Sequence, residues 1–281
     1  MPNTPCDSVA NSADMTSPND KVFVSTYQKE PSVGADFLPS AAVYARALHA
    51  LSLAAGTGVR PLSMHGVFVE EASARLPTSF FVTRKPPNGR NETRAVQDRQ
   101  EGRIVFAGIA TFAAALDFSS AVRNAKVPKF KQPSALRDVA TLHGYRLGER
   151  EDAHLTREVK RIEVRPLDPA AWFALDEGEQ QTRRCWLRCA QPMDAIDEHS
   201  LLVFFFGLCG RAGDHKPAAQ TLHFHQPTFR PAEWLLAEVK TTNAASSRPF
   251  VSCSFWNENG ELIATATKAA SAEAVEARAK V

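Results

Sequence analysis

The chain repeats itself at an offset of 158 residues. Residues 41–55 are an apolar stretch that stops at a glycine, and adding 158 gives residues 199–213, a second such stretch. The same offset pairs other landmarks of the two copies: His65 with His223, and the turn Glu101-Gly102 with Asn259-Gly260. Self-similarity at a fixed offset indicates copies of one structural unit. The sequence therefore predicts two similar halves.

Each copy begins with a helix whose surface is almost entirely apolar. In the first copy Ser40 is the expected N-cap and Gly56 the expected stop. A helix without a polar face must be covered by other structure. Strand-like runs separated by turn residues follow each helix, at 61–69, 78–85, 92–99 and 103–116, and again at 219–225, 233–240, 249–256 and 261–269. Each copy is thus expected to be a helix wrapped by an antiparallel sheet, in the α+β class.

These landmarks divide the 281 residues into four parts. Residues 1–20 are rich in Pro, Ser, Asn and Asp and are expected to form a flexible tail. The first copy covers 21–123, a linker covers 124–158, and the second copy covers 159–281. Two further elements are expected at the start of the second copy: a strand at 159–167 and a bridging helix at 168–181.

Composition narrows the class of protein. The net charge is +2 and no basic run is longer than a pair such as Arg183-Arg184, which is too little for a nucleic-acid groove. Five cysteines without CxxC spacing favour neither a disulfide framework nor a metal site. The apolar run Leu201–Phe206 is too short to cross a bilayer, and the polar start lacks the layout of a signal peptide. We expect a cytoplasmic protein, with the peroxisome as the alternative because the final Ala-Lys-Val is close to a peroxisomal tripeptide.

Several motifs follow one another in a distinctive order. SMHGVFV precedes TRAVQDRQEGRIVFAGIATF, then IEVRPLDP, and the second copy carries HFHQPTFRPAEWLLAEVKTTNAASSRPFVSCSFWNENGELIATAT. This order resembles the type II acyl-CoA thioesterases from about Asp20 to Ala270. The resemblance implies a double hotdog, in which two helices are each wrapped by an antiparallel sheet.

The resemblance also implies where catalysis would occur. Members of this family use an Asp at the end of the second helix, a Thr or Ser on the next strand and a Gln on the last strand. In this sequence those positions are Leu208 or Cys209, Pro217 or Ala218, and Lys268. The Gly-Gly-Gln that begins the first helix in the family is Ser40-Ala41-Ala42 here. All the catalytic positions differ, which predicts altered or lost hydrolysis.

Five residues are candidates for a rearranged catalytic set. Asp214 and His215 follow the second helix and could orient and deprotonate a water, or form a solvated loop. Thr221 lies four residues after the family hydroxyl position and could replace it, or simply fill a strand. Lys268 could polarise a carbonyl, or point to solvent. His65 could act as a base in another reaction, or share a structural role with His223.

Binding residues follow from the expected substrate. Arg90, Arg94 and Arg248 could meet the phosphates of coenzyme A, because a guanidinium binds phosphate through two hydrogen bonds. Coenzyme A is expected as part of the substrate, so no separate cofactor is predicted. His223 and His225 share a strand face but have no third ligand at a helpful spacing, so no metal is predicted.

The sequence leaves three functions open. The first is a hydrolase for a fatty acyl or polyketide thioester, with the aromatic run Phe204–Phe206 lining an apolar tunnel. The second is a double hotdog that performs dehydration, isomerisation or cyclisation, with His65 and an acidic residue as base and acid. The third is a binding protein without catalysis. A homo-oligomer is expected, because sheet edges favour pairing.

Overall fold

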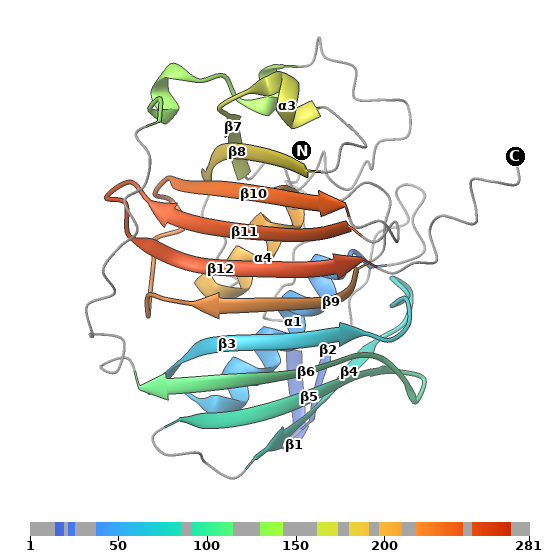
Figure 1. Ribbon diagram of the computed structural model, residues 1–281. Helices are drawn as coiled ribbons and strands as arrows, with labels where there is room; N and C mark the ends of the chain where they lie inside the picture. The colour runs from blue at the N-terminus through green and yellow to red at the C-terminus, as the bar shows by residue number, and fades with distance from the viewer. Residues whose placement is uncertain are drawn as a thin grey trace, which may run out of the picture.

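In the described part of the chain, 12 strands form one antiparallel sheet. The computed structural model describes residues 15–19, 22–25, 38–85, 91–114, 130–142, 162–173, 180–190, 197–209, 217–243 and 249–270. The strand order is β1-β2-β4-β5-β6-β3-β9-β12-β11-β10-β8-β7, so strands of the first half occupy one side and strands of the second half the other (Figure 1). The halves meet where β3 pairs with β9, with His65 opposite Thr221.

The two halves have corresponding elements. The first contains β1 (Met15–Asn19), β2 (Val22–Ser25), α1 (Ser40–Ala55), β3 (Val59–Phe68), β4 (Thr78–Arg84), β5 (Glu92–Gln100) and β6 (Arg103–Ala114). The 3₁₀ turns η3 (Pro133–Ala135) and η4 (Val139–Thr141) follow it. The second half contains β7 (Ile162–Pro166), α3 (Pro169–Phe173), β8 (Gln180–Cys189), α4 (Glu198–Cys209), β9 (Pro217–Phe224), β10 (Leu235–Asn243), β11 (Pro249–Asn257) and β12 (Leu262–Ala270). The double hotdog of the α+β class is confirmed.

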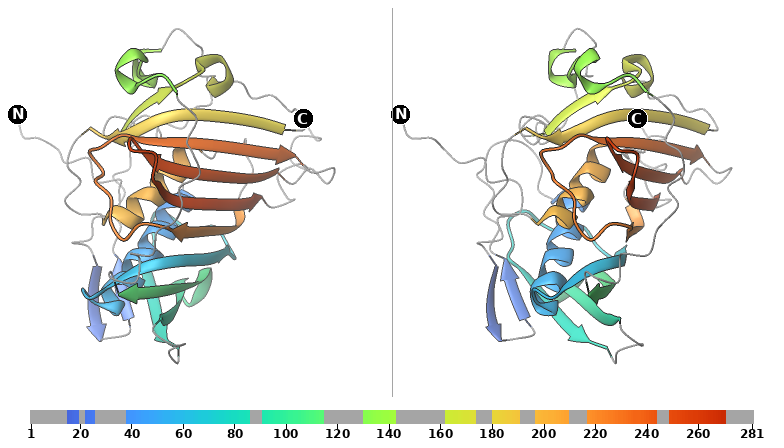
Figure 2. Two further views of the ribbon diagram at one scale, coloured as in Figure 1. Left: turned by 60° about the vertical axis from the view of Figure 1, so that its left-hand side comes forward. Right: turned by 90° about the vertical axis from the view of Figure 1, so that its left-hand side faces the viewer.

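Both long helices lie against the same face of the sheet and bury their apolar surfaces there (Figure 2). In α4 every described side chain except Glu198 and Gly207 is buried. The strands complete this core by alternation: in β11, Val251, Cys253 and Phe255 face inward and are buried. The prediction that an apolar helix requires a wrapping sheet is therefore confirmed in each half.

The two helices run antiparallel to each other. The start of α1 lies beside the end of α4, since Ala41 packs against Gly207. The end of α1 lies beside the start of α4, where His49 contacts Asp197. The helix pair therefore has two ends, each built from one helix of each half.

The helix contact gives the first prediction. A Cβ added to Gly207 would lie 2.7 Å from the Cβ of Ala41. Gly→Ala inside a helix ordinarily stabilises by about 1 kcal/mol, but Gly207→Ala should destabilise by about 1–3 kcal/mol because neither helix can yield at a rigid methyl group. Urea unfolding measures this. Adding Ala41→Gly should restore the lost stability, and a Gly207→Ala variant more stable than the native protein would contradict the prediction.

Some sequence predictions were wrong at the edges of elements. Met15–Asn19 form a strand paired with β2, although residues 1–20 were predicted to be a flexible tail. Pro39, not Ser40, is the N-cap of α1, and its side chain makes no capping hydrogen bond. Gly56 does end the helix, with a φ of 90° that favours glycine.

The largest error concerns residues 168–181, which were predicted to form one bridging helix. The helix α3 ends at Phe173, and β8 begins at Gln180. Asp168 accepts hydrogen bonds from the first free amides of α3, which accounts for the helical start. The alternation of buried Cys185 and Leu187 with partly exposed Arg184 gives the strand that follows.

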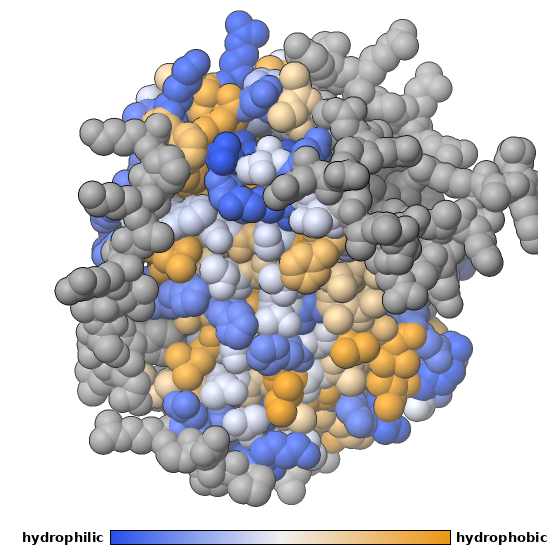
Figure 3. Space-filling view, in the orientation of Figure 1, coloured by the Kyte–Doolittle hydropathy of each residue, from blue (hydrophilic) through white to orange (hydrophobic). Residues whose placement is uncertain are grey.

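The opposite face of the sheet is a mixture of polar and apolar side chains (Figure 3). Exposed apolar side chains on this outer face include Val67, Ile109 and Phe81. In the described part of the chain, no helix is long and apolar enough to cross a membrane. Nor do the described residues contain three or more His, Cys, Asp or Glu side chains grouped to hold a metal ion.

Candidate functional site

The catalytic positions of the family map to the inner face of the second half, at the end of α4. Lys268 on β12 points inward there, and its Nζ lies 5.4 Å from the ring centroid of Phe206. Its neighbours across the sheet are Gln220, which is buried, and Val251. Lys268 thus faces the helix as one sequence alternative predicted, and the alternative that it points to solvent was wrong.

Three buried thiols surround the position of the family Asp. Cys209 is 1% exposed and in its thiol form donates to the carbonyl oxygen of Phe205 at 2.9 Å. Burial disfavours its thiolate, but hydrogen bonds from Cys185 and Cys253 and the charge of Lys268 outweigh burial and lower the pKa of Cys209. Burial, and then contact with Cys209, raises the pKa of the other two thiols. This end therefore combines a cation with a thiol cluster.

Thr221 lies on the opposite face of the sheet from this end. Its neighbours Gln220 and Leu222 are the buried, inward residues of β9. The Thr221 hydroxyl instead lies 3.2 Å from Nδ1 of His65, which is exposed on the outer face. The prediction that Thr221 replaces the family hydroxyl was wrong.

A register shift in β9 explains the error. Ala269 pairs with Ala219, whereas Ala270 pairs with Pro217. Ala218 is therefore an extra residue in β9. It interrupts the alternation of inward and outward side chains along the strand. Counting in steps of two from the family position consequently reached the wrong face.

His65 belongs to a shallow depression on the outer face. The depression has a volume of about 390 Å³, and its lining includes Gly66, Gly108 and Thr221. The ring of His65 lies 5.4 Å from that of His223, and burial and then this second imidazole lower the pKa of His65. Among the described residues its recorded contacts are a hydroxyl and an imidazole, so the acidic partner required by the second function is not found there.

Of the three arginines predicted to bind the phosphates of coenzyme A, only Arg94 lies among the described residues. Arg94 on β5 forms an ion pair with Glu92 and keeps 14% of its side chain exposed, so its charge is already engaged. Arg90 and Arg248 lie outside the described residues, as do Asp214 and His215.

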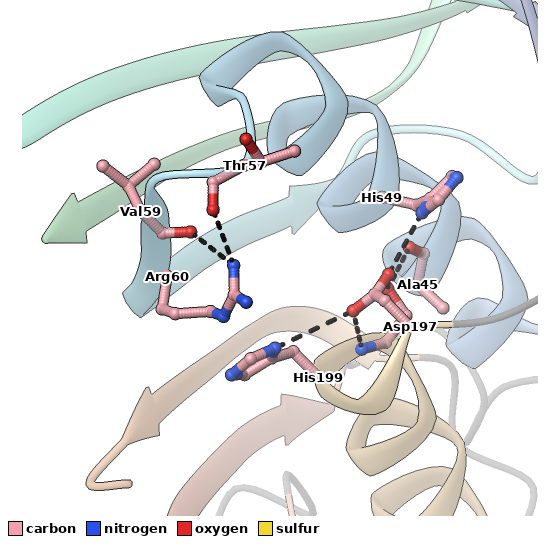
Figure 4. A network of polar contacts seen from close by, with 8 residues as sticks. Ala45, His49, Thr57, Val59, Arg60, Asp197 and His199 are labelled. Atoms are coloured by element: carbon pink, nitrogen blue, oxygen red, sulfur yellow. Dashed lines mark hydrogen bonds and ion pairs between the residues drawn. The ribbon is translucent and has the colours of Figure 1, made fainter. Parts of the chain in front are cut away.

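A polar network that sequence reasoning missed lies at the other end of the helix pair (Figure 4). Oδ2 of Asp197 lies 3.0 Å from Nδ1 of His49 and accepts a 2.6 Å hydrogen bond from the Ser200 hydroxyl. Oδ1 accepts a 2.9 Å hydrogen bond from the Ser200 amide and lies 4.0 Å from Nδ1 of His199. The Ser200 hydroxyl also reaches the carbonyl oxygen of Ala45 at 3.2 Å. One carboxylate therefore joins α1 to α4.

Burial and hydrogen bonds shift the pKa values of Asp197 and His199 in this network. Burial disfavours the charge of Asp197, but hydrogen bonds from His49 and Ser200 outweigh it and lower the pKa of Asp197 to about 2. Burial lowers the pKa of His199 to about 4, although the charge of Asp197 opposes this. At neutral pH the network therefore contains an ionised carboxylate beside a neutral His199.

One signal in the sequence could have located this network. Subtracting the repeat offset of 158 from residues 197–200 gives 39–42, which includes the position of the family Gly-Gly-Gln. The start of α4 is thus the counterpart of a segment that contributes to the family site. Its partner His49 could not be identified in this way, because the pairing depends on the antiparallel helices.

Comparisons with known proteins agree with this architecture. A family model described as the acyl-CoA thioesterase C-terminal domain matches residues 133–271. Acyl-coenzyme A thioesterase 8 of Homo sapiens is 25% identical over 246 residues, which cover 79% of this chain and 76% of that protein. The acyl-CoA thioesterase II TesB2 from Mycobacterium marinum has a TM-score of 0.71 and 18% identity, and the TesB protein of Mycobacterium avium subs paratuberculosis has a TM-score of 0.68 and 20% identity. Each alignment covers 92% of this chain and 96% of that structure. In sequence, the chain is thus similar to the acyl-CoA thioesterases, and it shares its fold with the solved type II thioesterases.

Proposed function

We propose that the chain hydrolyses acyl-CoA thioesters with a catalytic set that differs from that of its family. The observation that carries this proposal is the inward position of Lys268, which occupies the family Gln position on β12 and lies over Phe206. A cation held against an apolar helix can stabilise the negative charge that develops on a thioester oxygen, because few waters compete with it there.

The surroundings of Lys268 suit an acyl chain. Phe204, Phe205 and Phe206 are 3% exposed or less, and as consecutive residues of α4 they point to different sides of the helix. Sites for such ligands are mostly apolar with a few placed polar groups. We therefore propose a fatty acyl or polyketide thioester as the substrate, and Asp214 and His215 remain the proposed water-activating residues.

Thiol release from a panel of acyl-CoAs of increasing chain length tests this function. Lys268→Ala should lower kcat/KM by about 100-fold, the typical effect of removing one oxyanion donor. Lys268→Gln, which restores the amide of the family, should lose less. Asp214→Ala tests the proposed orientation of water.

Lys240→Ala is the matched control, since Lys240 is half exposed and pairs with Glu238 at 3.0 Å. It should keep the native rate. The absence of thiol release by the native protein at every chain length would refute hydrolysis and favour a binding protein. Full activity in Lys268→Ala would refute the role of Lys268.

A further inference from the structure

The repeat relates the two ends of the helix pair to each other. Only one of these ends corresponds to the catalytic site of the family. That site combines the end of α4 with the start of α1, where Gly207 meets Ala41. The repeat offset of 158 carries the start of α1 onto the start of α4, and the end of α1 onto the end of α4. The other end, formed by the end of α1 and the start of α4, is therefore the counterpart of the family site. The 12 residues of α4 separate the two ends by about 18 Å.

This counterpart end contains several polar side chains that contact one another. At the family end, by contrast, other residues stand at the catalytic positions of the family. His49 and His199 both direct Nδ1 toward the carboxylate of Asp197, at 3.0 and 4.0 Å (Figure 4). The contact of His49 Nδ1 with the carboxylate oxygen favours the tautomer whose proton lies on Nδ1, in which Nε2 is the acceptor. The positive charge of Arg60 acts to lower the pKa of both Glu198 and His199.

Capping of α4 explains only part of this arrangement. As the N-cap, Asp197 accepts the hydrogen bonds of Ser200. Capping requires neither imidazole. Nε2 of His49 is buried and has no hydrogen-bond partner among the described residues, whereas His199 also reaches the backbone carbonyl of Pro227. A buried polar atom without a partner, such as Nε2 of His49, is unfavourable unless a water or a ligand supplies one.

We propose that this end of the helix pair is a second thioester-binding centre in which His49 is the general base and Asp197 its positioning residue. The class of substrate rests on the proposed function. The buried Nε2 of His49 has an open acceptor position, which a bound water can fill, and His49 and Asp197 keep 15% and 29% of their side chains exposed at the edge of the pair.

The chemical step is a hydrolysis. Nε2 of His49 takes a proton from water while the water oxygen bonds to the thioester carbonyl carbon, and the carbonyl electron pair moves to oxygen. The tetrahedral intermediate collapses, the C–S bond breaks, and the departing thiolate takes the proton from the His49 imidazolium. The products are a carboxylic acid and coenzyme A.

Variants at this end test the base role through thiol release. Because the two centres would act independently, the test uses the Lys268→Ala background. There His49→Ala should lower the remaining kcat by about 100-fold or more with a much smaller change in KM, and added imidazole should restore part of that rate. Asp197→Asn should also lower kcat, although asparagine caps a helix as well as aspartate does and keeps the fold. His223→Gln, which changes an exposed imidazole on the outer face, is the matched control and should keep the native rate.

A second measurement separates this inference from the proposed function. A non-hydrolysable acyl-CoA thioether should shift the imidazole proton resonance that disappears in His49→Gln. An unmoved resonance, or a Lys268→Ala/His49→Ala variant as active as Lys268→Ala alone, would overturn the inference. A native protein that shifts this resonance and releases no thiol would refute the proposed function and the base role, and would leave a binding site.

Discussion

Arg46→Met should lower the free energy of unfolding by about 3–5 kcal/mol, the usual effect of removing one partner from a buried charge pair. Arg46 is 2% exposed in the middle of α1, and Asp98 on β5 is 0% exposed. Burial raises the pKa of Asp98, and the positive charge of Arg46 lowers it in turn. Removing Arg46 leaves a buried carboxyl without that compensating charge. Guanidinium unfolding measures the loss.

The loss should grow as the pH rises. Without Arg46, folding must protonate Asp98, whereas the unfolded carboxyl ionises above about pH 4. The native state then binds more protons than the unfolded state, so its stability falls with increasing pH.

Two variants show whether charge is the cause. Arg46→Met with Asp98→Leu removes both charges and should recover most of the lost stability. Arg84→Met removes an exposed partner of Glu92, which lies 3.8 Å away, and should change stability by less than about 1 kcal/mol. A double variant no more stable than Arg46→Met alone would contradict the buried-charge explanation.

Local patterns were sufficient to predict the repeated part of the fold. Alternating residues gave β11 and β12 nearly to the residue, and an apolar stretch followed by Gly56 gave α1. They failed at β8, because the helical start at Pro169 was extended through residues 174–179 into the alternation that begins at Gln180. The residues at the start of a helix do not show where a later change from helical to strand periodicity occurs.

The candidate sites show a different limit. The sequence left two orientations open for Lys268, and the structure places it on the inner face, where β12 keeps its register through residues 264–269. The position of Thr221 did not, because one extra residue reverses the alternation of a strand. The contact of His49 with Asp197 joins residues 148 apart in sequence and exists only because the helices are antiparallel. No local pattern carries that information.

His199 should make the protein less stable as the pH falls from about 6.5 to about 4. Burial, followed by the charge of Arg60, lowers the pKa of His199 to about 4, although Asp197 and the carbonyl of Pro227 oppose the shift. An unfolded histidine titrates near 6.5, so within this window the unfolded state binds a proton that the native state does not. Stability therefore rises with pH, and the full contribution of roughly 3 kcal/mol is present above pH 6.5. Urea unfolding at several pH values measures the slope.

His199→Gln should remove most of this slope, because glutamine does not titrate. His223→Gln changes an exposed imidazole on the outer face and should leave the slope in place. The two acid-sensitive groups act in separate windows, since the pKa of Asp197 is about 2 and its contribution is lost only as the pH falls below about 4. Asp197→Asn should therefore change the pH dependence below about 4, and a His199→Gln variant that retains the native slope between 4 and 6.5 would show that His199 is not the buried group responsible.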